Sequence, residues 1–195
     1  MSEIDREKWE KRYREGSYRA RTHPTALLEE WLPRLPRGRA LDVACGAGRN
    51  ALFLAAAGYE VDAIDISSAA LARAREKASQ SGLDVRWIEA DLETDSLPDR
   101  SYDLIIVVRY TDAALVPRLI SRLSDGGHLL YEQHLLTHCD VVGPSSAGFR
   151  MEPNELLALA AGLRVLHYAE GLVEDPDGRI AALAQLVACK GAPGF

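Results

Sequence analysis

The sequence predicts an α/β fold with a mostly parallel, seven-stranded sheet, helices on both faces and a C-terminal antiparallel hairpin. Two observations predict this fold class. Apolar runs of strand length alternate with helical segments as far as residue 161, and such alternation is typical of a parallel sheet covered on both faces. Beyond residue 161, two strand-like runs follow one another with no helical segment between them, which predicts the hairpin.

The elements can be assigned in chain order. Residues 4–16 and residues 23–36 (HPTALLEEWLPRLP) read as helices, the second with Pro24 in its first turn and Pro33 near its end. Ser67 or Ser68 can cap the helix that follows the second strand. The expected strands cover residues 39–44, 59–65, 84–90, 102–109, 126–134, 163–173 and 179–190, and the remaining helices cover residues 49–57, 69–82, 112–123 and 153–161.

The 195 residues are enough for one domain with a short extension. We expect a helical N-terminal segment over residues 1–38, which is a candidate lid, a main domain over residues 39–190 and a tail over residues 191–195. In the first segment, Trp9 and Tyr13 are spaced as on one helix face, and with Tyr18 they can either close over a ligand or pack as a stripe.

Charge and cysteine content limit the class of protein. Residues 1–39 carry ten Lys and Arg against seven Asp and Glu, whereas residues 40–195 carry 13 against 22. An acidic body of this kind argues against a nucleic-acid partner. The three cysteines form no disulfide pattern, and the charged N-terminus resembles neither a signal peptide nor a membrane span. We therefore expect a cytoplasmic protein with a small-molecule substrate and no membrane partner.

A glycine turn follows the first strand. Residues 46–51 (GAGRNA) match the GxGxxG/A pattern, and Asp65 ends the next strand about 20 residues later. This pattern alone favours a dinucleotide. In open parallel sheets the ligand lies at the carboxyl ends of the strands, so the residues that follow each strand are the candidates for its site.

Three further features favour a different cofactor. Asp42 lies inside the first strand near the turn, where a carboxylate suits an ammonium group better than an anionic pyrophosphate. Asp91, at the end of the third strand, can accept a hydrogen bond from the adenine amine. None of the seven tyrosines is followed four residues later by Lys, as short-chain hydride-transfer enzymes require. An NAD(P)-dependent dehydrogenase is thus disfavoured.

These residues resemble those of a Rossmann-like class I S-adenosylmethionine-dependent methyltransferase. More narrowly, they are similar to the tellurite-resistance methyltransferase family, which has an Arg-Thr-His stretch (here RTH, residues 21–23) and a DxGCGxGRN turn (here DVACGAGRN, residues 42–50). Residues 148–171 (GFRMEPNELLALAAGLRVLHYAEG) also resemble that family's late helix and strand.

The resemblance implies a placement of S-adenosylmethionine. Asp42 and the Gly46–Gly48 backbone would hold the methionine end, with Arg21 near its carboxylate. Asp65 would bind the ribose hydroxyls. The full set of implied cofactor-binding residues is Arg21, Asp42, Ala44, Gly46, Gly48, Asn50, Asp65, Ile66, Asp91, Leu92 and Val108.

The sequence departs from the family pattern at two places. Ala44 stands where the family usually has its first glycine. The family also places a His-Arg pair after its late strand, whereas residues 169–183 (AEGLVEDPDGRIAAL) contain no histidine. The second departure argues against tellurite or a selenium oxyanion as the substrate.

Four residues at the ends of the fourth and fifth strands are candidates for the acceptor side. Arg109 and Tyr110 follow the central strand, where they either touch the substrate or pack in a loop. Glu132 and His134 alternate on the next strand, and either can act as a base for a hydroxyl acceptor. No Asn-Pro-Pro-Tyr sequence is present, which disfavours a nucleobase or amide nitrogen as the acceptor.

Residues 139–150 (CDVVGPSSAGFR) form either a substrate lid or an ordinary loop. His134, His138 and Cys139 lack the helical setting that a metal site at this spacing needs, so we expect no metal. The expected activity is methyl transfer to a small-molecule thiol, oxyanion, hydroxyl or carboxylate. The alternative is a non-catalytic module that binds S-adenosylmethionine or a partner.

Overall fold

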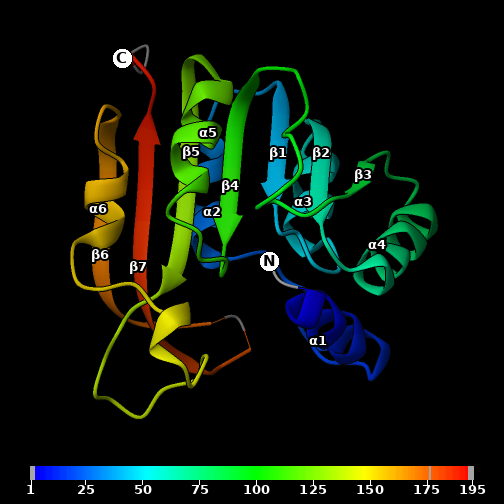
Figure 1. The fold of residues 1–195 in the computed structure, drawn as a ribbon. Helices are drawn as coiled ribbons and strands as arrows, with labels where there is room; N and C mark the ends of the chain where they lie inside the picture. Colours follow the sequence, from blue (N-terminus) through cyan, green and yellow to red (C-terminus); the bar gives the residue numbers. More distant parts are fainter. Residues whose placement is uncertain (1–2, 176, 193–195) are drawn as a thin grey trace.

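The computed structural model describes residues 3–175 and 177–192 (Figure 1). Its centre is a seven-stranded sheet with the order β3-β2-β1-β4-β5-β7-β6. The strands are β1 (Arg39–Val43), β2 (Glu60–Asp65), β3 (Arg86–Glu89), β4 (Tyr102–Val108), β5 (Leu123–His134), β6 (Arg164–Glu174) and β7 (Ile180–Cys189). The first five run parallel, whereas β7 is antiparallel to both β5 and β6. The predicted mostly parallel sheet with an antiparallel C-terminal hairpin is confirmed.

Helices cover both faces of the sheet, as predicted. The helices are α1 (Glu3–Arg14), α2 (Ala26–Trp31), α3 (Arg49–Ala56), α4 (Ser68–Ser81), α5 (Leu115–Arg122) and α6 (Glu155–Leu159), with 3-10 turns η1 (Leu32–Arg34) and η2 (Ala147–Phe149). Helices α2 to α6 pack against the sheet. One apolar core joins α5 and α6 to side chains such as Leu41 and Ile105. The other joins α2, α3 and α4 to the opposite sides of the same strands, through Leu104 and Ile106. Neighbouring side chains along β4 point in turn into one core and into the other. Because both faces of β4 are buried, its sequence is almost entirely apolar.

Some helices are shorter than predicted, for local reasons. Helix α5 begins at Leu115 because Asp112 lies in the preceding turn, where its carboxylate accepts hydrogen bonds from the backbone N–H groups of Ala114 and Leu115 at 3.0 and 3.3 Å. Helix α2 ends at Trp31 and continues as a 3-10 turn that contains Pro33. Ser67 is the residue that caps α4, since its hydroxyl accepts a hydrogen bond from Ala70 N–H at 3.1 Å.

Helix α1 lies apart from the sheet, beyond the carboxyl ends of β1 and β2, and packs against α4 (Figure 1). Of the predicted tail, residues 193–195 lie outside the described residues, and so does Pro176 in the predicted hairpin turn. In the described ranges, no helix has the length and apolar character needed to span a membrane.

Candidate active site

A cleft of about 600 Å³ opens at the carboxyl ends of the parallel strands. It brings together most of the residues that the sequence analysis selected. Those that line it are Arg21, Ala44, Gly46, Asn50, Asp65, Ile66, Leu92, Val108, Arg109, Tyr110 and His134. The other four, Asp42, Gly48, Asp91 and Glu132, are buried and are not among the described residues that line the cleft.

The turn after β1 has an unusual backbone. Ala44, Gly46 and Gly48 all have left-handed φ values, of 54°, 55° and 76°. Glycine adopts this region without strain, whereas alanine does not. A Cβ on Gly48 would lie 2.5 Å from the Trp87 ring. Gly48 therefore permits close packing of the turn against β3, and Gly46 is the one of these two glycines that lines the cleft.

Asp65, at the end of β2, organises the turn. One carboxylate oxygen accepts a hydrogen bond from Gly46 N–H at 2.7 Å, and the other accepts one from Ser67 N–H at 2.9 Å. Burial raises the pKa of Asp65, against these backbone hydrogen bonds. The carboxylate thus lies on the cleft wall with its orientation fixed by two loops.

Asp42 lies one strand away and is almost fully buried, with an exposed fraction of 1%. Its Oδ2 atom is buried and has no hydrogen-bond partner among the described residues. Burial raises the pKa of Asp42 to about 7. An unpartnered oxygen on a buried carboxylate is costly, so a cationic group placed beside this turn would be stabilised. This orphaned oxygen fits the ammonium group of an amino-acid-bearing cofactor.

Asp91, at the end of the third predicted strand, forms hydrogen bonds within the loop that follows β3. Its carboxylate accepts a hydrogen bond from Glu93 N–H at 3.0 Å, and its own N–H donates to Asp95 at 2.8 Å. Leu92, the next residue, lines the cleft instead. The loop after β3 therefore contributes an apolar side chain to the lining.

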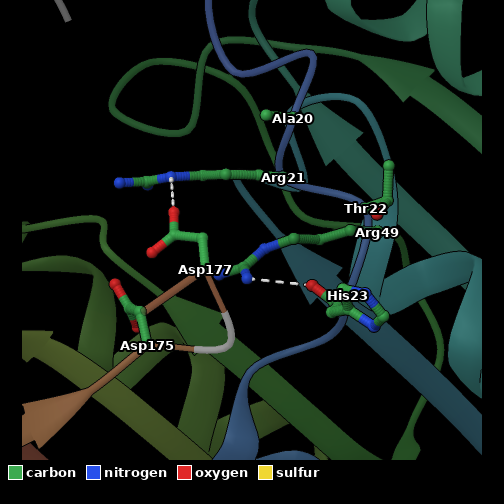
Figure 2. A pocket seen from close by; sticks show the side chains of 7 residues that line it. All are labelled: Ala20, Arg21, Thr22, His23, Arg49, Asp175 and Asp177. Atoms are coloured by element: carbon green, nitrogen blue, oxygen red, sulfur yellow. Dashed lines mark hydrogen bonds and ion pairs between the residues drawn. The ribbon is translucent and has the colours of Figure 1, made fainter. Parts of the chain in front are cut away.

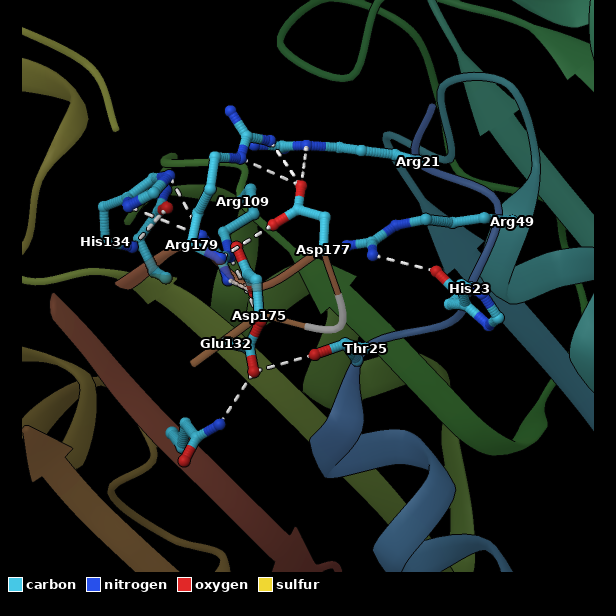
Figure 3. Close-up of polar contacts among 12 residues, drawn as sticks. Arg21, His23, Thr25, Arg49, Arg109, Glu132, His134, Asp175, Asp177 and Arg179 are labelled. Atoms are coloured by element: carbon cyan, nitrogen blue, oxygen red, sulfur yellow. Dashed lines mark hydrogen bonds and ion pairs between the residues drawn. The ribbon is translucent and has the colours of Figure 1, made fainter. Parts of the chain in front are cut away.

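The other end of the cleft is built around Arg109, which has a left-handed φ of 62°. Its Nε donates to Glu132 at 3.1 Å, and its Nη2 donates to Asp175 at 2.8 Å. Its Nη1 lies 3.2 Å from Nε2 of His134 (Figure 3). All three nitrogens of the guanidinium therefore have protein partners.

Glu132 is enclosed by donors. Its Oε2 accepts hydrogen bonds from the Thr25 hydroxyl and from Gln185 Nε2, both at 2.8 Å, while Oε1 faces Arg109. The exposed fraction of Glu132 is 1%. Sequence reasoning missed Thr25, Gln185 and Asp175; the one available signal was a single amide side chain in the otherwise apolar run of β7.

His134 is neutral at ordinary pH. Burial, followed by the nearby guanidinium groups of Arg109, Arg150 and Arg21, lowers the pKa of His134 to about 3. Neighbouring Tyr110 has its hydroxyl buried without a partner among the described residues, and burial raises the pKa of this phenol. At neutral pH, His134 therefore stays unprotonated and Tyr110 keeps its proton.

Helix α1 packs over the end of the cleft that contains the glycine turn. The Tyr13 hydroxyl lies so close to Gly46 that a Cβ on this residue would clash with it. Glu10 accepts hydrogen bonds from the Ser67 and Ser68 hydroxyls at 2.7 and 2.9 Å and from Ala69 N–H at 3.2 Å. Helix α1 therefore packs on both the glycine turn after β1 and the loop after β2, which Asp65 connects by hydrogen bonds. Trp9 and Tyr18 also line the cleft.

The segment after α1 meets the β6–β7 hairpin in a small pocket. It is lined by Ala20, Arg21, Thr22, His23, Arg49, Asp175 and Asp177 (Figure 2). Arg21 lies 4.0 Å from the Asp177 carboxylate, which also pairs with Arg179. Arg49 donates to the His23 carbonyl at 3.0 Å. Arg179, from the stretch that lacks the family's histidine, lines the main cleft.

The loop over residues 139–150 borders the cleft through Val142, Gly143, Pro144, Ser145, Ser146 and Phe149. Arg150 fastens it by donating to the carbonyls of Pro144 and Leu135, each at 2.9 Å. His138 and Cys139 are exposed at its start. Among the described residues, no three His, Cys, Asp or Glu side chains are grouped so that they could hold a metal ion.

Comparison with known proteins agrees with this geometry. Residues 40–127 match the methyltransferase domain family. Hemagglutinin 1 of Eikenella corrodens is 32% identical over 150 residues, which cover 72% of this chain and 49% of that protein. The "Probable S-adenosyl-L-methionine-dependent methyltransferase TehB" of Haemophilus influenzae is 27% identical over 143 residues, covering 70% and 49%.

The crystal structure of TehB from Haemophilus influenzae superimposes with a TM-score of 0.71 at 24% identity, over 84% of this chain and 61% of that one. The chain spans about half the length of the curated relatives it matches. The family assignment follows from three observations: the strand order, the glycine turn with its two acids, and these matches. Residues 40–127 form a methyltransferase domain, and the predicted resemblance of the chain to class I S-adenosylmethionine-dependent methyltransferases, TehB among them, is confirmed.

Proposed function

We propose that the protein transfers a methyl group from S-adenosylmethionine to a small-molecule acceptor. The observation that carries this proposal is the pair of buried acids beside the glycine turn, Asp42 and Asp65. Asp65 faces the cleft and suits the ribose hydroxyls, and the unpartnered oxygen of Asp42 suits the ammonium group. A pyrophosphate would bring negative charge next to both carboxylates, which disfavours a dinucleotide.

The remaining cofactor contacts follow from the cleft lining. The Gly46 backbone would approach the methionine end, with Arg21 near its carboxylate. Ile66 and Leu92 would pack on the adenine, while Asp91 would support the loop that carries Leu92. Ala44, Asn50 and Val108 complete this wall, and Gly48 lets the turn pack closely enough to form it.

When bound, the cofactor would supply an electrophilic methyl group on a sulfonium. The protein's task is then to align the acceptor with that methyl and to exclude water. Arg109, Tyr110 and His134 line the opposite end of the cleft. We assign them to the acceptor, with Glu132 behind them.

The protonation states of His134 and Glu132, at the acceptor end of the cleft, limit the class of acceptor. A pKa of about 3 for His134 and the enclosure of Glu132 by three donors leave both groups poorly suited to deprotonate a hydroxyl. An acceptor that arrives as an anion needs no base. Arg21, Arg109 and Arg179 line the cleft and favour negative charge. We therefore infer that a thiolate, a carboxylate or another oxyanion is a better acceptor than an alcohol.

Isothermal titration with S-adenosylmethionine and with NAD tests the cofactor. We expect S-adenosylmethionine to bind and NAD to produce no heat of binding; the reverse result would overturn the proposal. A second assay follows labelled methyl transfer to panels of thiols, carboxylates, oxyanions and phenols at neutral pH. Binding of S-adenosylmethionine without transfer to any panel would favour the non-catalytic module instead.

A further inference from the structure

Thr25 connects the two ends of the cleft. It precedes α2 and is 2% exposed. Its backbone N–H donates to the Asn50 side chain at 3.0 Å, which ties it to the glycine turn. Its hydroxyl donates to Glu132 at 2.8 Å, which ties it to β5. One residue thus bonds to both the cofactor-facing turn and the acceptor-facing strand.

Gln185 approaches the same oxygen from the other side. It lies in β7 directly opposite Glu132 in the antiparallel register, and its Nε2 donates to Oε2 of Glu132 at 2.8 Å. A buried carboxylate is stable only when its lone pairs are satisfied. Two donors on Oε2 fix the plane of the carboxylate, so that Oε1 points at Arg109 Nε (Figure 3).

Arg109 depends on this support because of its backbone. A φ of 62° at a residue other than glycine is strained and persists only when the surroundings hold it. The ion pair with Glu132, together with the contacts to Asp175 and His134, sets the direction of the guanidinium. If Glu132 could rotate, one of the three anchors of Arg109 would be lost.

We propose that Thr25 and Gln185 are positioning residues for the acceptor end of the site, an inference that rests on the proposed function. They hold Glu132 in the rotamer that fixes Arg109, and Arg109 in turn holds the His134 ring against the cleft. Glu132 is accordingly the buried anchor of this network and does not act as the base. Because the backbone N–H of Thr25 donates a hydrogen bond to Asn50, the network also connects the glycine turn to Glu132.

The test uses the full-length protein with arginine labelled with nitrogen-15. The measured quantity is the hydrogen-exchange rate of the Arg109 Nε–H group, whose signal is assigned by its loss in Arg109→Lys. Thr25→Val removes the hydroxyl at nearly constant shape, and Thr25→Ser keeps it. Thr94→Val is the matched control, since Thr94 is exposed in the connection between β3 and β4.

We expect Arg109 Nε–H to exchange at least tenfold faster in Thr25→Val than in the wild type. Thr25→Ser and Thr94→Val should exchange at the wild-type rate. A wild-type rate in folded Thr25→Val overturns the proposal, and so does equal acceleration in Thr25→Ser, because the effect would then depend on packing. Should Thr25→Val fail to fold, Gln185→Leu applies the same criterion through the second donor.

Titration with S-adenosylmethionine separates this inference from the proposed function. Thr25→Val retains the backbone bond to Asn50, so we expect its affinity to stay within threefold of the wild type. If the wild type itself does not bind the cofactor, the proposed function fails, whatever the exchange rates show. If binding is normal and Arg109 exchange is unchanged, only the positioning role fails.

Discussion

Asp65 holds Gly46 through a 2.7 Å hydrogen bond from the Gly46 N–H group to its carboxylate. The acid that ends β2 therefore shapes the turn that follows β1. The same carboxylate also accepts a hydrogen bond from Ser67 N–H. This dual use means that a substitution at Asp65 affects both the local structure and the ligand.

We predict that Asp65→Ala weakens S-adenosylmethionine binding by at least about tenfold. Hydrogen bonds to a charged group contribute about 1.5–3 kcal/mol each, and two ribose hydroxyls would lose their acceptor. The free energy of unfolding should also fall by about 1–3 kcal/mol, because two buried N–H groups lose their partner. Calorimetry and urea denaturation measure the two effects. Asp84→Ala, at an exposed acid before β3, should leave both unchanged. Unchanged affinity in Asp65→Ala would remove Asp65 from the site.

Asp42 should make cofactor affinity depend on pH. With a pKa of about 7 in the free protein, the carboxylate is mostly protonated below that pH and cannot pair with an ammonium group. We predict that affinity rises as the pH increases from about 6 to 8, and that Asp42→Asn lowers affinity at pH 8 at least about tenfold. The carboxylate-dependent part of the pH profile should vanish in this variant. A variant that binds normally with an unaltered profile would show that Asp42 does not contact the ligand.

The same group affects stability in the opposite direction. Its folded pKa lies above the usual aspartate pKa of 3.8, so its protonated form favours the folded state. This contribution is fully present below about pH 4 and is lost as the pH rises to about 7. Without ligand, Asp42→Asn should therefore gain in melting temperature relative to the wild type as the pH increases across this range. A constant difference between the two proteins would contradict the raised pKa.

Ala44→Gly should stabilise the protein. Alanine at a φ of 54° is strained by about 1–2 kcal/mol, whereas the added freedom of glycine in the unfolded chain costs about 0.4–1 kcal/mol. We expect a net gain of up to about 1 kcal/mol in urea denaturation. Ala57→Gly is the control, because Ala57 has an ordinary φ of −81° and should only lose stability. A loss in Ala44→Gly equal to that of the control would mean that the turn bears no strain at this residue.

Helix α1 is predicted to act as a lid fastened by Glu10. Glu10→Ala removes all three hydrogen bonds to the start of α4, so amide exchange over residues 9–23 should accelerate while the sheet stays protected. In the wild type, S-adenosylmethionine should slow amide exchange in the same residues. A shortened protein that starts near Pro24 should fold but bind the cofactor much more weakly. Glu7→Ala, at an exposed residue of α1, should behave as the wild type. Slow exchange that the cofactor does not alter would instead indicate a permanently docked helix.

The sequence could predict that Asp65 and the glycine turn lie together at one edge of the sheet, because their placement depends on short-range patterns. Asp65 and the glycine turn each follow an apolar run, and parallel strands bring their carboxyl ends together. Gly48 shows the limit of this reasoning. The pattern treats both glycines alike, but only the folded structure places Trp87 against the second one.

The acceptor end could be predicted only in part. Arg109, Glu132 and His134 were selected from strand ends, but their mutual contacts were not. Thr25 and Glu132 are 107 residues apart, and Gln185 meets Glu132 only because β7 pairs with β5. A hairpin signal predicts that β6 and β7 pair with each other, but it does not say which of them lies against β5. The neutral state of His134 likewise depends on its burial in the folded protein and, after that, on three arginines from separate segments.

The position of β7 between β5 and β6 has a consequence for biogenesis. Strand β6 is made before β7 but hydrogen-bonds to it along its length, and β7 also completes β5 (Figure 1). During synthesis, residues 164–174 must therefore wait without their sheet partner until residues 180–189 have left the ribosome. A stalled or nonsense-truncated chain that ends before Ile180 would display an unpaired edge of β5, which is a ready template for aggregation.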